Sequence, residues 1–102
     1  MRLEFHPEAQ HELNEAAERY EGEVTGLGER LGAEVERATT LLLRHPEIGA
    51  PLDEDLRSWV LYRFPFTLIY SVSTEAVRVV AVAHQSRRPE YWRSRVGDET
   101  TS

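Results

Sequence analysis

The spacing of apolar residues changes near residue 46, and this change constrains the fold more than any other feature of the chain. Before it, apolar residues recur every three or four positions, which is the period of an amphipathic helix. After it, they alternate with their neighbours, which is the period of a half-buried strand. The sequence therefore predicts an α+β protein in which two helices precede most of the sheet.

The first half of the chain predicts two helices. The first begins at Pro7, since proline is favoured in a helix's first turn, and its apolar face comprises Ala9, Leu13, Ala16, Ala17, Tyr20 and Val24. A glycine-containing break follows, and a second apolar face ends near Arg44-His45-Pro46 and comprises Leu27, Leu31, Val35, Ala38 and Leu42. The two faces predict an antiparallel helical hairpin. We expect four carboxylates on the other side of the first helix to be solvated: Glu8, Glu12, Glu15 and Glu18.

The remaining pattern predicts strands at both ends of this hairpin. Leu3 and Phe5 alternate with charged residues before it, while 46–55 reads as a loop because of its prolines and consecutive acids. Three predicted strands then form an antiparallel meander. The first begins at Arg57 and includes Trp59 to Phe64. The second runs from Phe66 to Val72, and the third runs from Val77 to Ala83.

The last of these strands is apolar at successive positions, so we expect it to be buried on both faces inside the sheet. A short C-terminal helix is predicted to begin at Pro89. The expected fold is therefore an N-terminal strand, a two-helix hairpin, a three-stranded meander packed as one sheet, and a short C-terminal helix.

Length and composition predict one small domain. The 102 residues leave room for a single core, which we assign to 1–96, with 97–102 as a flexible polar tail. The chain has no cysteine, so disulfides, thiolate catalysis and cysteine-bound zinc are excluded. It also has no apolar run of roughly 20 residues and no recognisable signal peptide, so we expect a cytoplasmic location without membrane contact.

Charge is distributed unevenly along the chain. Residues 1–55 carry 14 acidic residues and 5 arginines, a net charge of −9, whereas 56–102 carry 4 acidic residues and 7 arginines, a net charge of +3. Every basic residue is an arginine, since the chain has no lysine. Because the planar guanidinium suits phosphate and carboxylate groups, the C-terminal half is the better candidate for holding an anionic partner.

The strongest candidate functional residues follow the last predicted strand. His84, Arg87, Arg88, Tyr91 and Trp92 fall within nine positions. Adjacent arginines beside aromatic rings suit the recognition of anions and of protein interfaces. Each residue also has a structural interpretation: the histidine can be hydrogen-bonded at the strand end, the arginines can pair with acids, and the rings can pack on the core.

Two further arginines, Arg57 and Arg63, are weaker candidates for partner binding, because exposed arginines in strands also discourage pairing between sheet edges.

No metal site is predicted: His6 precedes the first helix, and no H-E-x-x-H pair accompanies the glutamates of that helix. No phosphate-binding glycine loop or G-x-S-x-G turn is present, so no cofactor is expected.

An ordered set of residues resembles the RelE/ParE toxin superfamily over roughly residues 2 to 95. The set comprises His45-Pro46, Gly49, Arg57, Phe64-Pro65-Phe66, Ile69-Tyr70, Val82-Ala83-His84, Arg87-Arg88-Pro89 and Tyr91-Trp92. This resemblance implies the toxin of a type II toxin–antitoxin module, neutralised by a cognate antitoxin and associated with plasmid stabilisation. RelE-like members cut messenger RNA on the ribosome, whereas ParE-like members are associated with poisoning DNA gyrase.

The ParE-like branch fits the residues better. The resemblance implies that a RelE-like member would cleave RNA with lysines and arginines on the sheet face and a tyrosine near the C-terminus. This chain has no lysine, and Thr67 stands where an arginine is expected. We therefore predict an inhibitory binder rather than an enzyme. The alternatives are a metal-independent, ribosome-dependent endoribonuclease using His84, Arg87 and Tyr91, and an inactive relic that retains only antitoxin binding.

Overall fold

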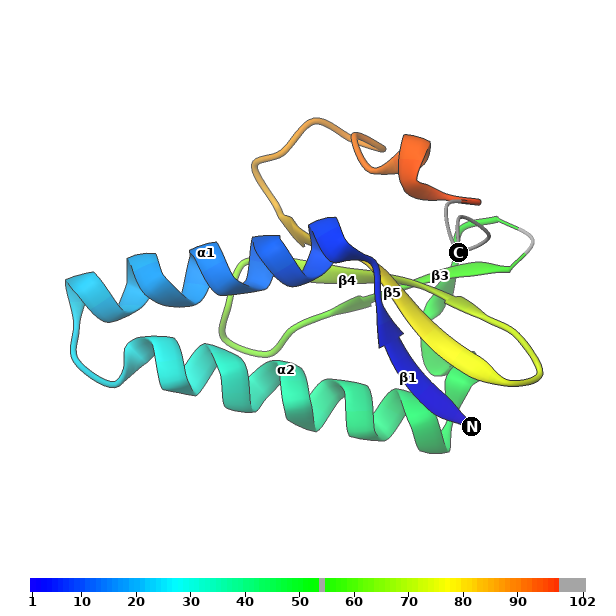
Figure 1. Cartoon of the computed structure of the whole chain (residues 1–102), viewed down its shortest axis with the longest axis horizontal. Helices are drawn as coiled ribbons and strands as arrows, with labels where there is room; N and C mark the ends of the chain where they lie inside the picture. Colours follow the sequence, from blue (N-terminus) through cyan, green and yellow to red (C-terminus); the bar gives the residue numbers. More distant parts are fainter. Residues whose placement is uncertain (54, 98–102) are drawn as a thin grey trace.

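The protein forms two helices and a five-stranded mixed sheet in a computed structural model that describes residues 1–53 and 55–97 (Figure 1). In chain order the elements are β1 (Arg2–Phe5), α1 (Pro7–Glu23), α2 (Leu27–Arg44), η1 (Pro46–Ile48), β2 (Ala50–Pro51), β3 (Leu56–Val60), β4 (Phe66–Val72), β5 (Ala76–His84) and η2 (Arg93–Arg95). The predicted α+β class is confirmed. Of the predicted tail, only Gly97 lies within the described residues.

The helices form the predicted antiparallel hairpin, and its turn depends on one left-handed glycine and one carboxylate. Gly26 precedes α2 with φ of 90°, a conformation that costs glycine little. The Glu21 carboxylate then accepts hydrogen bonds from the amides of Gly26 (2.7 Å) and Gly28 (2.9 Å), which satisfies donors at the start of α2. Val24, predicted on the apolar face of the first helix, instead follows α1 in an extended conformation and is exposed.

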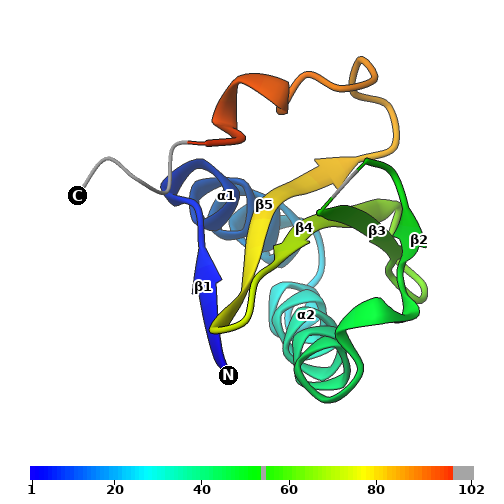
Figure 2. The ribbon, with the colours of Figure 1, turned by 90° about the vertical axis from the view of Figure 1, so that its right-hand side faces the viewer.

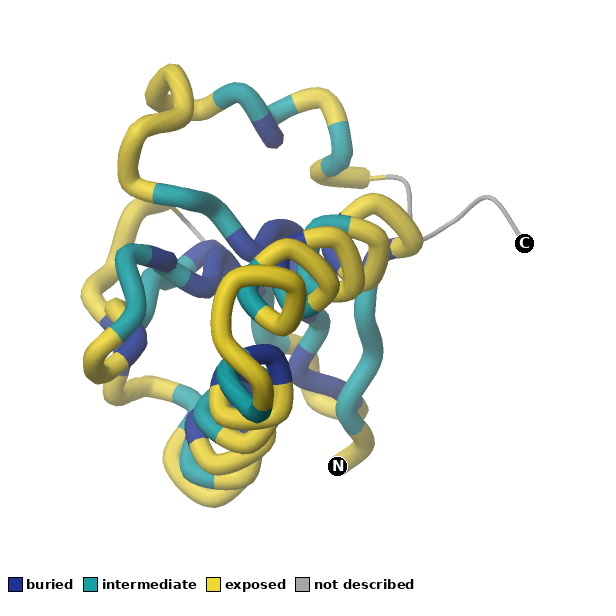
Figure 3. The backbone as a smooth tube through the Cα atoms, turned by 90° about the vertical axis from the view of Figure 1, so that its left-hand side faces the viewer, coloured by how far each residue is buried: buried dark blue, intermediate teal, exposed yellow. Residues whose placement is uncertain are grey.

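Both helices pack on one face of the sheet (Figure 2), and the main core lies between them and the sheet, where the backbone is coloured as buried in Figure 3. Its buried members from the helices are Ala9, Ala16, Leu31, Val35, Ala38 and Leu42, and those from the strands include Phe66, Leu68, Tyr70, Val77, Val79 and Val82. The outer turns of the helices are exposed. No helix within residues 1–53 and 55–97 is long and apolar enough to cross a membrane.

The sheet has the order β1-β5-β4-β3-β2, with β1 parallel to β5 and the other pairs antiparallel. The predicted meander is therefore confirmed, and β5 lies inside the sheet between β1 and β4. A register shift between β4 and β5 opposes Ile69 to Ala81 but Tyr70 to Val79, which leaves Val80 as an extra residue. Beyond this bulge the faces exchange, so Val82 joins the helical core while Ala81 faces the other side.

The structure corrects three local predictions. The segment 46–55 is not only a loop, since it contains η1 and the edge strand β2. The strand expected from Trp59 to Phe64 ends at Val60, and Arg63 lies in a turn with φ of 72°, which a strand cannot contain. The C-terminal helix does not begin at Pro89, because Glu90 has φ of 60°; only the short 3-10 helix η2 follows it.

Candidate functional site

The C-terminal segment, residues 85–97, turns back from the end of β5 and lies along the sheet face opposite the helices (Figure 1). Hydrogen bonds from the Gln85 amide to the Pro65 carbonyl (2.8 Å) and from the Arg87 amide to the His84 carbonyl (3.0 Å) fix this turn. Of the candidate residues after the last strand, the structure places Arg87 against the Tyr91 ring and brings His84 and Arg87 to one groove.

Trp92 fastens the segment to that sheet face. Trp92 is 5% exposed, and its side chain packs in a second apolar cluster with Leu56, Ile69, Val80 and Ala81. The guanidinium of Arg93 lies over its ring at 4.7 Å. The structural interpretation of Trp92 is thus confirmed, and burial of a ring this large leaves little of it for direct contact with a partner.

Glu12 of α1 accepts four hydrogen bonds, three from the same segment and one from β5. The Tyr91 hydroxyl donates to Oε2 (2.6 Å), and Arg95 donates to both carboxylate oxygens (3.0 and 2.8 Å). The amide of Val82 donates to Oε1 (3.0 Å). The side chains of Glu12 and Arg95 are each 12% exposed, so the prediction that Glu12 is solvated is wrong.

This ion pair occupies a gap at the edge of β5. β1 pairs with β5 only as far as Val79, and the chain then leaves the sheet for α1. The next outward-facing groups of β5 would lack partners, but Val82 donates its amide to Glu12 and the Val80 carbonyl accepts from Arg95 (3.1 Å). The two side chains replace the hydrogen bonds that a longer β1 would have made.

The network shifts the ionisation of its members. Burial alone would raise the pKa of Glu12, but hydrogen bonds from Arg95, Tyr91 and the Val82 amide outweigh it and hold that pKa below its ordinary value. Burial, followed by the hydrogen bond to Glu12, raises the pKa of the Tyr91 hydroxyl. The hydrogen bond to Glu12 raises the pKa of Arg95. Glu12 is therefore a carboxylate and Tyr91 a neutral donor near neutral pH.

The outer surface of the segment is cationic. The guanidinium of Arg87 stacks on the Tyr91 ring at 3.9 Å, and Arg88 is exposed. Neither arginine forms an ion pair within residues 1–53 and 55–97. Beside them is a groove of about 260 Å³ lined by residues that include His84, Arg87 and Arg19. His84 accepts a hydrogen bond from the Ser86 amide at Nδ1 (3.0 Å) and packs edge-on against Phe66 (5.0 Å).

Arg57 lies on β3, beside the edge strand β2 at the other side of the sheet, and donates to nearby backbone carbonyls. It donates to the backbone carbonyls of Glu47 (2.9 Å) and Gly49 (2.8 Å), so it fastens η1 and β2 to β3. Tyr70 supports the same segment by donating to the Pro46 carbonyl (2.7 Å) and accepting from the Gly49 amide (3.0 Å). Arg63 lies in the turn between β3 and β4, so the two weaker candidates do not join the cluster around Arg87.

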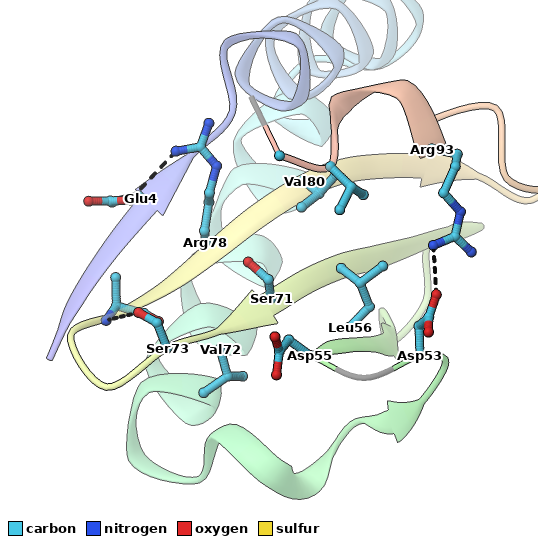
Figure 4. Close-up of a pocket in the computed structure, with 13 residues that line it drawn as sticks. Glu4, Asp53, Asp55, Leu56, Ser71, Val72, Ser73, Arg78, Val80 and Arg93 are labelled. Atoms are coloured by element: carbon cyan, nitrogen blue, oxygen red, sulfur yellow. Dashed lines mark hydrogen bonds and ion pairs between the residues drawn. The ribbon is translucent and has the colours of Figure 1, made fainter. Parts of the chain in front are cut away.

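A cavity of about 310 Å³ lies on the open sheet face, beneath the end of the C-terminal segment (Figure 4). Its charged groups are largely paired with one another: Arg78 approaches Glu4 at 3.6 Å, and Arg93 contacts Asp53 at 3.0 Å. In the part of the chain that the structure describes, no three acidic or histidine side chains are grouped as a metal ion would need.

Comparison with known proteins identifies the family. The model of the ParE toxin of type II toxin–antitoxin systems, parDE, matches residues 3–89. The chain belongs to the ParE toxin family. Accordingly it is the toxin component of a type II toxin–antitoxin system of ParE type, which implies a cognate antitoxin as its partner. The matched range includes Glu12, Arg87 and Arg88, and it ends before Tyr91.

A solved structure shares this fold. It is a chain of the chromosomal ParDE toxin–antitoxin system from P. aeruginosa, to which this chain is similar with a TM-score of 0.69 and 17% sequence identity. The match covers 82% of this chain and 95% of that one. No curated protein sequence gives a significant match.

The sequence pattern did not indicate the two residues that connect the C-terminal segment to α1, Glu12 and Arg95. Glu12 lies on the polar side of a helix, where a carboxylate is ordinarily solvated, and Arg95 follows it 83 positions later. The one available signal was the spacing of Tyr91 and Arg95 after a strand, which places an aromatic donor and a cation close together.

Proposed function

We propose that this ParE-type toxin acts in the cytoplasm as an inhibitory binder, with DNA gyrase as its target, and that Arg87 and Arg88 contact the target or the antitoxin. The observation that supports this is the pair of arginines without ion-pair partners among the described residues, carried on a segment anchored by Glu12 and Trp92. Exposed guanidinium groups on a rigid base lose little entropy when they bind a carboxylate or phosphate.

The anchoring contacts favour recognition over catalysis. A general base must have a free lone pair within reach of the substrate. His84 uses Nδ1 to accept from Ser86, while Tyr91 donates its hydroxyl to Glu12 and has a raised pKa. Neither group is placed as the base of a nuclease, so in our proposal His84 and Tyr91 support the binding surface, and the ribonuclease mechanism is the weaker alternative.

The remaining candidates have secondary roles in this proposal. Arg57 already gives its Nη1 to two backbone carbonyls, so it stabilises the sheet edge rather than a partner. Trp92 holds the segment in place from the core. Arg63 lies in the turn between β3 and β4, apart from the surface that Arg87 and Arg88 form.

Induced expression with and without the neighbouring small reading frame tests the proposal. We expect the wild-type protein to arrest growth alone and to form a stable complex with a co-expressed antitoxin. The variant carrying Arg87→Ala and Arg88→Ala should lose growth arrest, antitoxin binding or both. Its free energy of unfolding should change by only about 0–1 kcal/mol, because exposed charges contribute little to folding.

Arg44→Ala serves as the matched control, since Arg44 is an exposed arginine on α2 without an ion pair among the described residues. It should retain both activities. A folded double variant that still arrests growth and still binds the antitoxin would remove Arg87 and Arg88 from the binding surface.

A further inference from the structure

The cavity of about 310 Å³ on the open sheet face contains an arginine with unused hydrogen-bond donors. The Arg78 side chain is 17% exposed, and its Nε is buried without a hydrogen-bond partner among the described residues. Its Nη1 lies 3.6 Å from Oε1 of Glu4, which is longer than a hydrogen bond. Because a guanidinium removed from water is costly unless it is fully paired, Arg78 contributes little to the stability of the fold.

Glu4 does not depend on Arg78 for a partner. Its Oε2 accepts a hydrogen bond from Nε of Arg2, its neighbour on β1, at 2.7 Å. An apolar residue in place of Arg78 would therefore leave Glu4 paired and would remove the buried, unpaired Nε. A buried charge that the fold does not need is a candidate for binding a ligand.

Arg78 belongs to a row of residues that crosses the sheet. It is in register with Glu4 of β1 and with Ser71 of β4, and Ser71 is in turn opposite Leu56 of β3. Neighbouring strands lie about 4.8 Å apart, so the row from Arg78 to Leu56 spans about 10 Å. Figure 4 shows Ser71 between Arg78 and Asp55. The row therefore presents a cation, a hydroxyl and an apolar side chain in sequence, with a carboxylate at its far end.

That carboxylate, of Asp55, is available. Asp55 precedes Leu56 directly, is exposed, and forms no ion pair within residues 1–53 and 55–97. Its backbone carbonyl accepts a hydrogen bond from the Val72 amide (3.2 Å), which fixes the residue beside β4. The buried side chains of Leu56 and Val80 also line the cavity and form an apolar floor.

The charges of the cavity favour a ligand that carries both signs. Three carboxylates and two guanidinium groups line it, those of Glu4, Asp53, Asp55, Arg78 and Arg93, so their net charge is −1. Asp53 is paired with Arg93 at 3.0 Å. An anion alone would increase the negative charge, and a cation alone would leave the donors of Arg78 unused. A zwitterion pairs with both Arg78 and Asp55 and leaves the net charge unchanged.

We propose that this cavity binds a small, elongated zwitterion, with its carboxylate on Arg78 and its ammonium or guanidinium group on Asp55. The volume lies at the lower end of the range of about 300–1,000 Å³ that is usual for ligand pockets, which suits a single small molecule. The length of the row requires a chain between the two charges, as in an ω-amino or ω-guanidino acid. Its methylene groups would cross the apolar floor. The site contains neither Arg87 nor Arg88, so the inference does not rest on the proposed function.

Titration of the full-length, isotope-labelled protein with 6-aminohexanoate tests this inference. Hexanoate and hexylamine are the matched references, because each lacks one of the two charges, and sodium sulfate tests an anion alone. We expect amide shifts at residues 55, 56, 71 and 78, and binding of each reference several-fold weaker. No shift at these residues up to about 10 mM ligand, or equal binding of hexanoate or sulfate, would overturn the proposal.

Two variants test the two ends of the site. Arg78→Met should weaken binding about tenfold or more, while the unfolding midpoint stays unchanged or rises. Asp55→Asn should weaken binding of 6-aminohexanoate several-fold and leave binding of hexanoate unchanged. Unchanged binding of 6-aminohexanoate by either variant, or a lower unfolding midpoint for Arg78→Met, would contradict the proposal.

Two further variants are controls. Glu75→Gln changes an exposed carboxylate in the turn between β4 and β5 that does not line the cavity, and it should bind 6-aminohexanoate as the wild type does. The same holds for the variant carrying Arg87→Ala and Arg88→Ala. Failure of this inference is therefore distinguishable from failure of the proposed function, and weaker binding by either control would contradict the location of the site.

Discussion

Replacement of Glu12 by alanine is expected to destabilise the protein strongly, although the residue lies on the polar side of a helix. The substitution leaves four donors without their acceptor: two from Arg95, the Tyr91 hydroxyl and the Val82 amide. Removing one partner of a fully buried ion pair costs about 3–5 kcal/mol, and each buried unsatisfied donor about 1–3 kcal/mol. Because both side chains retain 12% exposure, water replaces part of the loss, and we expect about 2–4 kcal/mol.

Chemical unfolding followed by tryptophan fluorescence measures this loss directly. A domain of this length is stable by roughly 5–15 kcal/mol, so the shift in midpoint should be large. The matched control is Glu15→Ala, because Glu15 is one turn away and 63% exposed, and its one ion pair among the described residues is with His11 at 3.3 Å. That change should stay within about 0.5 kcal/mol. In a double-mutant cycle, Glu12→Ala and Arg95→Ala should be far from additive.

The stability that Glu12 contributes should also decrease at acidic pH. The pKa of Glu12 lies lower in the folded protein than its ordinary value of 4.5. The stability that this carboxylate contributes is therefore fully present above pH 4.5 and is lost as the pH falls through the lowered folded-state pKa. The alanine variant should lack this acid-dependent step. Equal unfolding midpoints for the Glu12 and Glu15 variants at neutral pH would refute our account of how the C-terminal segment is held.

Four other substitutions test the packing and the hydrogen bond of Tyr91. Trp92→Ala should cost about 3–5 kcal/mol in unfolding experiments, since the ring is buried in the second cluster, and an unchanged midpoint would contradict its anchoring role. Gly49→Ala should destabilise the protein, because a Cβ there would collide with the Tyr70 hydroxyl. Gly32→Ala has open space in α2 and should stabilise the protein by about 0.5–1 kcal/mol. A Gly49 variant more stable than the Gly32 variant would be inconsistent with the structure. Burial, and then the hydrogen bond to Glu12, raise the pKa of Tyr91 above its ordinary 10.0. The stability that the Tyr91 hydroxyl contributes should therefore be present below pH 10 and be lost as the pH rises further. In an alkaline titration, Tyr91→Phe should remove this step.

The helices were predictable because their signal is local. The apolar faces that begin at Ala9 and Leu27 each recur with the helical period, and the hairpin follows from two such faces separated by glycines. The meander was predictable for the same reason. Alternation from Phe66 to Val72 specifies a strand with one face toward the helices, and the structure places it there.

Long-range contacts and single-residue irregularities were not predictable. The bulge at Val80 interrupts the alternation without changing the composition of β5, so the exchange of faces leaves no trace in the sequence. Pro89 is a good first residue for a helix, yet the left-handed Glu90 ends that possibility, because burial of Trp92 on the sheet decides the local path. Glu12 was predicted to be solvated because nothing near it in the sequence indicates its pairing with Arg95.

The candidate site also combines features that the sequence predicts with contacts that it does not predict. The clustering of His84, Arg87, Arg88 and Tyr91 was visible because they follow one strand within a few residues. Their roles depend on contacts that the neighbouring sequence does not indicate. Examples are the stacking of Arg87 on Tyr91 and the hydrogen bond that the Tyr91 hydroxyl donates to Glu12 of α1.

We propose that this ParE-type toxin binds its target through Arg87 and Arg88 rather than cutting RNA. The most direct measurement is a parallel assay of the purified protein on gyrase-catalysed plasmid supercoiling and on messages in a translation extract. We expect accumulation of cleaved plasmid or loss of supercoiling with intact messages, and loss of this effect in the folded Arg87→Ala, Arg88→Ala variant. Codon-specific cuts in translated messages, with gyrase unaffected, would contradict it and would assign His84, Arg87 and Tyr91 to catalysis.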